Sequence, residues 1–291
     1  MIRKFGIFLE MIKFEHTIFA LPFAFIGALL GAVVMEKRLP EWSEIGWIVL
    51  AMIGARSAAM GLNRVIDRAM DKQNPRTERR AIPAGLLRTG EVMLFIIASF
   101  AILFIAAAKL NPLCMKLMPI AVVMLVLYSY TKRFTWLCHI VLGLTIGLAP
   151  LGGWVAVTGA FDLPAWLLYA SVAFWLAGFD IIYACQDFEF DRREGVYSIP
   201  ARFGLPGALW LARAFHFVTA AGFLTLFWLT QLSWGYLLGV VIAAAILFYE
   251  HWIVRPSDLS RVQTAFFTMN GVLSTVLFVF TLFDLVVLRK W

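Results

Sequence analysis

The segment that organises this chain reads Ala51-Met-Ile-Gly-Ala-Arg56-Ser-Ala-Ala-Met-Gly-Leu-Asn63-Arg-Val-Ile-Asp67-Arg-Ala-Met-Asp71. Residues four apart lie on one face of a helix, so Asn63, Asp67 and Asp71 form a polar stripe at the end of an apolar segment. Charges in or near a bilayer are costly and usually functional where they occur. The segment therefore predicts a membrane helix that carries functional groups at one end.

Composition places the whole chain in a membrane. Hydrophobic residues make up 62% of the 291 residues, against roughly 45–50% in soluble domains, and the mean hydropathy is +0.84. Apolar segments of about 20 residues, the length that spans a bilayer, recur along the chain. We expect an all-α integral membrane protein, a single transmembrane domain over residues 1–291. Its nine expected spans are residues 16–35, 44–62, 91–108, 113–130, 136–158, 164–184, 207–229, 232–250 and 263–288.

The basic residues indicate orientation. If the N-terminus is cytoplasmic, 18 of the 25 Lys and Arg residues fall on the cytoplasmic side, 6 fall outside, and Arg56 lies within a helix. This asymmetry follows the positive-inside rule and predicts a cytoplasmic N-terminus in a bacterial cytoplasmic (inner) membrane. The net charge of +7 is therefore interpreted as a topology signal. Neither a nucleic acid nor an obligatory protein partner is expected.

A second acidic segment, Tyr183-Ala-Cys-Gln-Asp187-Phe-Glu-Phe-Asp191, repeats the spacing of the first. It follows the sixth expected helix, as the first follows the second. The hydrophilic stretches 63–90 and 186–206 both contain an acidic pair, two adjacent arginines and Ile-Pro-Ala. We interpret this as a pseudo-repeat of four helices, followed by a ninth helix. Parallel repeats place related loops on one membrane face, with a site between them.

The two acidic pairs supply a set of oxygen ligands. Mg²⁺ prefers such oxygens and is commonly held by a few carboxylates together with substrate phosphate oxygens. The candidate ligands are Asn63, Asp67, Asp71, Asp187 and Asp191. Glu189 falls out of phase and is expected to be solvated. The three cysteines form no Cys-x-x-Cys, and the histidines do not cluster, so neither a disulfide framework nor a zinc site is indicated.

Two charged residues are expected deeper in the membrane. Arg56 lies about 10 Å below Asn63, where an arginine costs about 2.5–3.5 kcal/mol on insertion scales, so we expect it to face a protein cavity. Its guanidinium would suit a carboxylate ligand; the alternative is an ion pair with Asp180. Tyr183 and Asp180 continue the second stripe inward. Tyr183 would either bind a phosphate or lie at the interface.

A basic pair follows the fourth expected helix, in Tyr128-Ser-Tyr130-Thr131-Lys132-Arg133. A cation here could bind a diphosphate oxygen and stabilise a leaving group; the alternative is a topology signal. Most of the remaining arginines of the hydrophilic stretches are interpreted as topology determinants: Arg64, Arg68, Arg76, Arg79, Arg80, Arg192 and Arg193. His16 and His139 are isolated and are expected to be hydrogen-bonded interfacial residues, not bases.

Together these motifs resemble those of the UbiA superfamily of intramembrane prenyltransferases. Asn63-x3-Asp67-x3-Asp71 matches the first aspartate-rich motif of the family, and Asp180-x2-Tyr183-x3-Asp187-x3-Asp191 is similar to the second. The Lys132-Arg133 loop resembles the family's Tyr-Pro-x-x-Lys-Arg loop, with Ser129 in place of proline. Arg56 falls where the 4-hydroxybenzoate branch carries an arginine. The resemblance spans essentially the whole chain.

The resemblance implies a helical barrel around a central cavity, Mg²⁺ as cofactor, and a polyprenyl diphosphate as donor. The five candidate ligands would bind Mg²⁺-diphosphate, Lys132 would bind the diphosphate directly, and Arg56 would bind the acceptor's carboxylate. Arg133, Tyr183 and Asp180 are further candidates for substrate binding. The acceptor would be 4-hydroxybenzoate or 1,4-dihydroxy-6-naphthoate, in ubiquinone or menaquinone biosynthesis. The amino-acid sequence of the second hydrophilic stretch resembles the menaquinone branch more closely than the ubiquinone branch.

Two other functions fit parts of the sequence less well. A multi-helix transporter could use Arg56 and Asp180 as an intramembrane coupling pair, but the acidic pairs are expected together on one membrane face, away from the centre. Phosphatidyl transfer from a CDP-lipid usually carries an Asp-Gly-x-x-Ala-Arg signature, which the sequence lacks.

Overall fold

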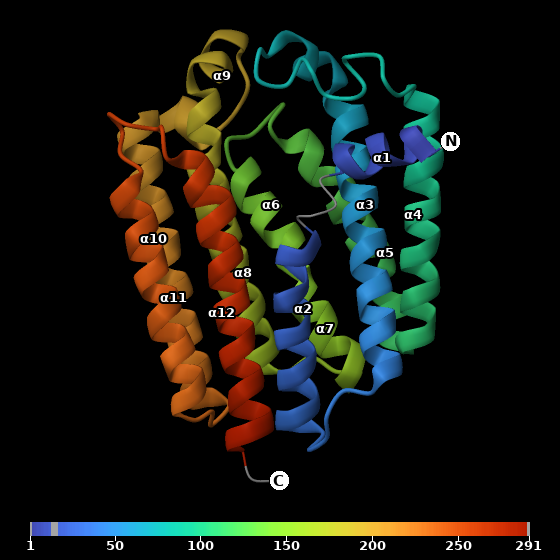
Figure 1. Ribbon diagram of the computed structural model, residues 1–291, viewed down its shortest axis with the longest axis vertical. Helices are drawn as coiled ribbons and strands as arrows, with labels where there is room; N and C mark the ends of the chain where they lie inside the picture. Colours follow the sequence, from blue (N-terminus) through green and yellow to red (C-terminus); the bar gives the residue numbers. More distant parts are fainter. Residues whose placement is uncertain (1, 13–16, 290–291) are drawn as a thin grey trace.

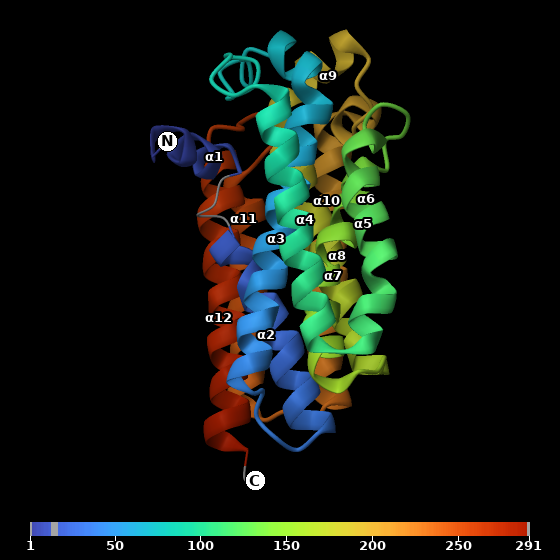
Figure 2. The same cartoon turned by 90° about the vertical axis from the view of Figure 1, so that its right-hand side faces the viewer.

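The computed structural model describes residues 2–12 and 17–289, and in this part of the chain the regular structure is helical, with no β-strand. His16, one of the two isolated histidines, lies outside the described residues. The helices stand side by side as an elongated bundle (Figure 1), and a view turned by 90° shows the same alignment (Figure 2).

The α-helices and their bounds are α1 (Ile2–Met11), α2 (Thr17–Leu30), α3 (Trp42–Gln73), α4 (Thr89–Leu110), α5 (Pro112–Thr131), α6 (Cys138–Ile146), α7 (Leu148–Thr158), α8 (Leu163–Ala184), α9 (Phe188–Glu194), α10 (Ile199–Leu229), α11 (Trp234–Ile253) and α12 (Asn270–Phe283). Short turns of other helical types extend three of them. These are π-helical at Gly31–Met35, Thr264–Met269 and Asp284–Leu288, and 3₁₀-helical at Cys185–Asp187.

The prediction of an all-α membrane protein is confirmed. Eight helical stretches of the described residues are long and apolar enough to cross a membrane, and Leu21–Met35 is a shorter apolar helix. These correspond in order to the nine expected spans. The first expected span begins at residue 16, outside the described residues, so its full length is not compared.

The expected span 136–158 is confirmed as one apolar stretch, Cys138–Thr158, but it is a bent pair of helices, α6 and α7. The bend lies at Gly147, whose N–H donates to the carbonyl of Gly143 at 2.8 Å. Pro150 lies in the first turn of α7, a position that tolerates a residue without an N–H.

Glycines bring α2 and α7 into direct backbone contact. A Cβ at Gly27 would collide with the carbonyl of Pro150, and one at Gly153 would collide with the carbonyl of Ala24. Small residues allow such close packing between membrane helices, where apolar burial adds little driving force. The contact anchors the centre of the bundle, next to its largest buried cluster, which includes Phe23, Trp154, Trp175, Phe223 and Tyr236.

The two hydrophilic stretches lie at the same end of the bundle, as the pseudo-repeat predicts. In Figure 1 the turns that follow α3 and the short helix α9 are neighbours at the top of the view. The most extensive helix packings are α3 against α4 and α8 against α10, which occupy equivalent places in the repeat. The two acidic motifs therefore approach each other from opposite halves of the chain.

Candidate active site

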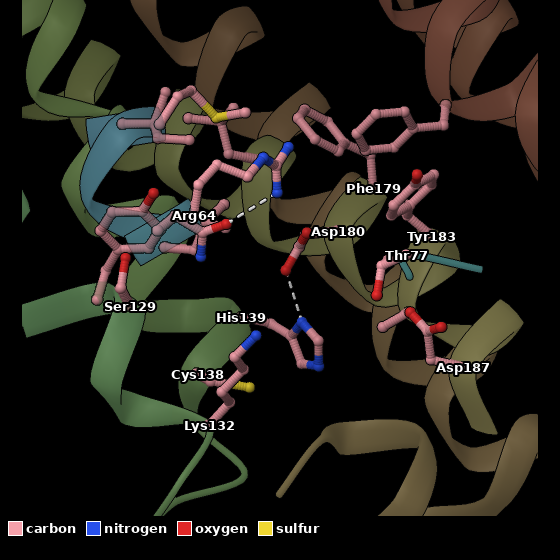
Figure 3. Close-up of a pocket in the computed structure, with 18 of the residues that line it drawn as sticks. Arg64, Thr77, Ser129, Lys132, Cys138, His139, Phe179, Asp180, Tyr183 and Asp187 are labelled. Carbon is pink, nitrogen blue, oxygen red and sulfur yellow. Dashed lines mark hydrogen bonds and ion pairs between the residues drawn. The ribbon is translucent and has the colours of Figure 1, made fainter. Parts of the chain in front are cut away.

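A cavity of about 700 Å³ opens between the two acidic motifs and continues into the bundle. Charged and polar residues line the end near the motifs, and aliphatic and aromatic residues line the remainder. Figure 3 shows part of this lining. The polar group includes Asn63, Asp71, Arg76, Lys132, Asp187 and Asp191. The apolar group includes Phe23, Val172, Trp175, Leu176, Phe179 and Phe266.

The first motif is built around the buried carboxylate of Asp67, on the cavity side of α3. The residue is 0% exposed, and its Oδ2 accepts from Asn63 Nδ2 at 2.7 Å and pairs with Lys132 Nζ at 2.6 Å. Asn63 and Lys132 line the cavity, whereas Asp67 lies behind them. Three residues that the sequence separates by 69 positions (63 to 132) are therefore one cluster.

Asp71, one turn further along α3, lines the cavity directly. Its Oδ1 accepts from Arg80 Nη1 at 2.7 Å, and its backbone carbonyl accepts from Thr77 Oγ1 at 3.1 Å. Both partners come from the turns after α3. This segment folds back so that Arg80 covers a carboxylate that precedes it in the chain.

The second motif does not continue as one helix, contrary to the continuous stripe expected from the spacing. The helix α8 ends at Ala184, a 3₁₀ turn follows at Cys185–Asp187, and α9 begins at Phe188. Asp187 lies in that turn, and Asp191 is buried in α9 at 8% exposure. Both still line the cavity. Glu189 is exposed, as predicted.

Asp187 is held from the other half of the chain. Arg76 donates to both of its oxygens, Nε to Oδ1 at 2.8 Å and Nη2 to Oδ2 at 2.5 Å, and Asn74 Nδ2 donates to Oδ1 at 3.0 Å. Burial alone lowers the pKa of Arg76, but the hydrogen bonds and charge of Asp187 outweigh it and raise that pKa above its ordinary value. Arg76 is therefore a permanent cation.

Tyr183 connects this ion pair to the apolar part of the cavity. Its hydroxyl accepts from Arg76 Nη1 at 3.0 Å, and its ring lies against Phe266 with 4.0 Å between the centroids. Phe266 belongs to the π-helical turn Thr264–Met269, which precedes α12. Tyr183 thus contacts both the Arg76–Asp187 ion pair and an aromatic residue of the cavity wall.

The remaining candidates are divided between the cavity and its outside. Arg56 lines the cavity, as expected from its position within an apolar helix. Asp180 also lines it and pairs with His139 Nδ1 at 2.6 Å. Arg133 does not line it. Its Nη2 donates to the carbonyl of Ile66 at 2.5 Å and lies 3.8 Å from Asp67 Oδ1. The structure therefore separates the adjacent cations Lys132 and Arg133.

Sequence reasoning missed four contributors to this site. Arg76 and Arg80 were interpreted mainly as topology determinants, yet each binds a motif carboxylate. Asn74 was not considered, and His139 was expected at the interface. Only the position of Arg76, Arg80 and Asn74 in the same hydrophilic stretch as the motif could have suggested them. The pairing of His139 with Asp180 had no signal in the sequence.

The residues present suit Mg²⁺. Asp67 Oδ1 and Asp71 Oδ2 are buried and accept no hydrogen bond within the described residues. In the same residues no three His, Cys, Asp or Glu side chains gather closely enough to hold a metal. A cation here would therefore need additional oxygens from Asn63 and from a bound ligand, which is the usual arrangement for Mg²⁺ with a phosphate.

Comparison with known proteins agrees with this chemistry. Residues 24–272 match the UbiA prenyltransferase family. A 4-hydroxybenzoate octaprenyltransferase of Actinobacillus pleuropneumoniae serotype 3 (strain JL03) is 28% identical over 266 residues, which cover 91% of this chain and 89% of that protein. Another, from Vibrio atlanticus (strain LGP32), is 27% identical over 244 residues, which cover 84% and 86%.

Solved structures share the fold. The apo structure of a UbiA homologue from Aeropyrum pernix K1 has a TM-score of 0.84 and 32% sequence identity, over 93% of this chain and 98% of that one. A UbiA homologue from Archaeoglobus fulgidus bound to GPP and Mg²⁺ has a TM-score of 0.76 and 20% identity, over 97% and 100%. With the family match across most of its length, this chain belongs to the UbiA prenyltransferase family and is a membrane-embedded prenyltransferase.

Proposed function

We propose that this enzyme transfers a polyprenyl group from a polyprenyl diphosphate to a ring carbon of a hydroxylated aromatic carboxylate, with Mg²⁺ as cofactor. One observation carries the proposal: two acidic motifs from distant parts of the chain face a single cavity that becomes apolar further in. A polyprenyl diphosphate is divided in the same way, since it has a charged diphosphate head and a long apolar hydrocarbon chain. The names of the bacterial relatives support 4-hydroxybenzoate as the acceptor.

The charged end would hold the diphosphate and its metal. Mg²⁺ would be held by the carboxylates of Asp67, Asp71, Asp187 and Asp191, with the amide oxygen of Asn63 as a further ligand. When bound, Mg²⁺ would neutralise charge on the diphosphate oxygens. Asp67 and Asp71 already present buried oxygens that accept no hydrogen bond in the described residues.

Lys132 would stabilise the departing diphosphate. Its ammonium group lines the cavity and is anchored by Asp67 at 2.6 Å, so its position is fixed before the substrate binds. A cation that is already oriented toward developing negative charge lowers the barrier without further reorganisation. The C–O bond to the diphosphate would then break and leave an allylic centre with cationic character for the aromatic ring to attack.

The inner part of the cavity would hold the two organic groups. Tyr183, Phe266 and Phe179 present aromatic rings that can shield a cationic centre. Arg56 lines the same cavity, and its guanidinium would bind the acceptor's carboxylate through two parallel hydrogen bonds. Asp180 is assigned to the acceptor side. Arg133 is left out of the proposal because it does not line the cavity.

The second candidate acceptor is 1,4-dihydroxy-6-naphthoate. It also combines a ring hydroxyl with a carboxylate, so Arg56 would bind its carboxylate equally well. The resemblance of residues 186–206 to the menaquinone branch favours this acceptor. The enzyme is proposed to lie in the bacterial cytoplasmic membrane with its acidic motifs on the cytoplasmic side. The excess of basic residues on that side supports this orientation.

The test uses the purified protein in liposomes. It would be incubated with Mg²⁺, a set of polyprenyl diphosphates of different lengths, and one of the two acceptors, and mass spectrometry would detect C-prenylated product. We expect product from one acceptor and its loss with EDTA. Absence of product from both acceptors, with a protein that remains folded by circular dichroism, would contradict the proposal.

A further inference from the structure

A histidine and an aspartate form a buried pair in the wall of the cavity. His139, in the first turn of α6, is 4% exposed, and its Nδ1 lies 2.6 Å from Asp180 Oδ2 on α8. Both residues line the cavity (Figure 3). Neither is assigned a step in the chemistry proposed above.

The pairing determines which ring nitrogen remains available. An ionised carboxylate can only accept hydrogen bonds, so Nδ1 must carry the proton that lies between His139 and Asp180. Nε2 is buried and has no hydrogen-bond partner among the described residues. A buried nitrogen without a partner is costly, and a catalytic role is one explanation for such a group in a native protein. In the neutral ring, Nε2 carries the lone pair of a residue that lines the cavity.

We propose that His139 accepts the proton of the acceptor's ring hydroxyl, and that Asp180 positions His139 for this step. The inference rests on the proposed function, since it requires a hydroxylated aromatic acceptor in the cavity. It assigns a catalytic residue to a histidine that the sequence alone placed at the interface. A carboxylate that fixes the tautomer and orientation of a histidine base is an arrangement used by many hydrolases.

The proton balance is as follows. The acceptor's O–H bond breaks and its proton moves to His139 Nε2, so that electron density on the ring rises. The ring carbon beside the oxygen forms a bond to the allylic carbon as the C–O bond to the diphosphate breaks, and the bonding pair leaves with the diphosphate. The ring carbon then loses its hydrogen to water, and His139 returns its proton to the ring oxygen. The net products are prenylated phenol, diphosphate and one proton.

Several ionisable groups surround this histidine. Asp180 is on α8, Cys138 precedes it on α6, Lys132 follows α5, and Asp191 is on α9. Lys132 and Asp191 belong to the proposed diphosphate site, so a pH profile of the wild-type enzyme alone would report several groups. The test therefore compares variants across acceptors of different acidity.

The experiment measures kcat for wild type and His139→Gln with 4-hydroxybenzoate and with 3-fluoro-4-hydroxybenzoate. The fluorinated acceptor has a more acidic hydroxyl and keeps one free ring position beside it. We expect kcat of His139→Gln to fall about 100-fold with 4-hydroxybenzoate, while KM for the prenyl diphosphate stays within about twofold of wild type. The deficit should shrink with the fluorinated acceptor and with rising pH, because an ionised hydroxyl needs no base.

Three further variants complete the design. His251→Gln replaces a histidine that does not line the cavity and should keep the wild-type ratio of rates for the two acceptors. Asp180→Asn should resemble His139→Gln in this ratio if Asp180 acts through His139. Imidazole added to His139→Gly should restore part of the lost rate.

Three results would overturn the inference: an equal deficit for both acceptors in His139→Gln, no response of His139→Gly to imidazole, or wild-type turnover in His139→Gln. Failure of the proposed function would be distinct, since the wild-type enzyme would then prenylate neither acceptor and the inference would fall with it. Circular dichroism in detergent would establish that each variant is folded.

Discussion

The two acidic motifs have the same spacing in the sequence but different structures. Asn63, Asp67 and Asp71 lie on the single helix α3, which continues without a break to Gln73. Asp187 and Asp191 are separated by the junction between a 3₁₀ turn and the short helix α9. A duplicated pattern therefore does not imply a duplicated geometry.

The partners of the two motifs differ as well. Asp67 is 0% exposed and pairs with Lys132, which follows a neighbouring helix. The side chain of Asp187 is 16% exposed and is held by Arg76, which belongs to the hydrophilic stretch of the first motif. Asp67 is thus held by a residue at the end of a neighbouring helix, whereas Asp187 is held by a loop contributed by the other half of the chain. This comparison predicts unequal consequences for equivalent changes.

The largest expected effect is that of Asp67→Asn, compared with Asp187→Asn. Asp67→Asn removes a proposed metal ligand and leaves Lys132 without its buried counter-charge, so kcat should fall about 1,000-fold. Asp187→Asn should cost about 100-fold, because its amide oxygen can still accept from Arg76. Prenyl transfer at saturating Mg²⁺ would be measured for both. Glu189→Gln is the exposed control and should remain near wild type. Equal losses, or near-normal turnover in both variants, would contradict the comparison.

A second contrast concerns the adjacent cations that follow α5. Lys132→Met should lower kcat about 100-fold, the range found when one stabilising donor is removed from a transition state. Arg133→Met should change kcat less than about threefold, because Arg133 lies outside the cavity and donates to the Ile66 carbonyl. Paired kinetic assays at several diphosphate concentrations would separate kcat from KM. A greater loss in Arg133→Met would mean that the diphosphate enters from outside the described cavity.

A smaller effect is expected on metal affinity. Arg76 occupies both oxygens of Asp187, so a metal that binds Asp187 must compete with it. Removing this partly exposed ion pair in Arg76→Gln should release about 1 kcal/mol for metal binding, or about fivefold tighter binding of Mn²⁺ in the absence of diphosphate. Electron paramagnetic resonance titration would measure it. Arg80→Gln is the matched change at Asp71, and weaker binding in both would indicate that the arginines support the metal site.

Most of the fold follows from the length of the apolar segments in the sequence. Spans of about 20 apolar residues correspond to the observed helices because a membrane helix must satisfy its own backbone hydrogen bonds. The bend between α6 and α7 was not expected, since a single glycine at position 147 does not break an apolar pattern. The helix break before Asp187 was not predicted either, because the sequence Ala-Cys-Gln contains neither glycine nor proline.

The acidic part of the candidate site was accessible from sequence because carboxylates are rare in apolar chains. Its basic part was not. Arginines such as Arg76 also satisfy the positive-inside rule, so their presence alone does not distinguish a ligand from a topology signal. Only the folded loop places Arg76 on Asp187. The role of His139 was not accessible from sequence either, because its contact with Asp180 joins α6 and α8, and the sequence does not show that these two helices pack together.

The smallest effect is expected at the glycine that ends the second motif. Gly195 terminates α9 with a φ of 69°, a backbone conformation that costs about 1 kcal/mol for a residue with a Cβ. No atom lies within 4 Å of the position of such a Cβ, so Gly195→Ala should add only this strain. Because the N–H of Gly195 donates to the Asp191 carbonyl, we expect lower thermal stability and a loss of activity of about twofold.

Two controls locate this effect in the backbone of the second motif. Gly195→Asn should cost less than Gly195→Ala, since asparagine tolerates the left-handed region. Gly85→Ala introduces the same strain at a φ of 71° in the first hydrophilic stretch, away from the uninterrupted helix that carries Asp67 and Asp71. It should lower the melting temperature to a similar extent and leave kcat unchanged. A loss of activity at Gly85 equal to that at Gly195 would mean that the first motif also depends on its loop, and the contrast between the two halves would disappear.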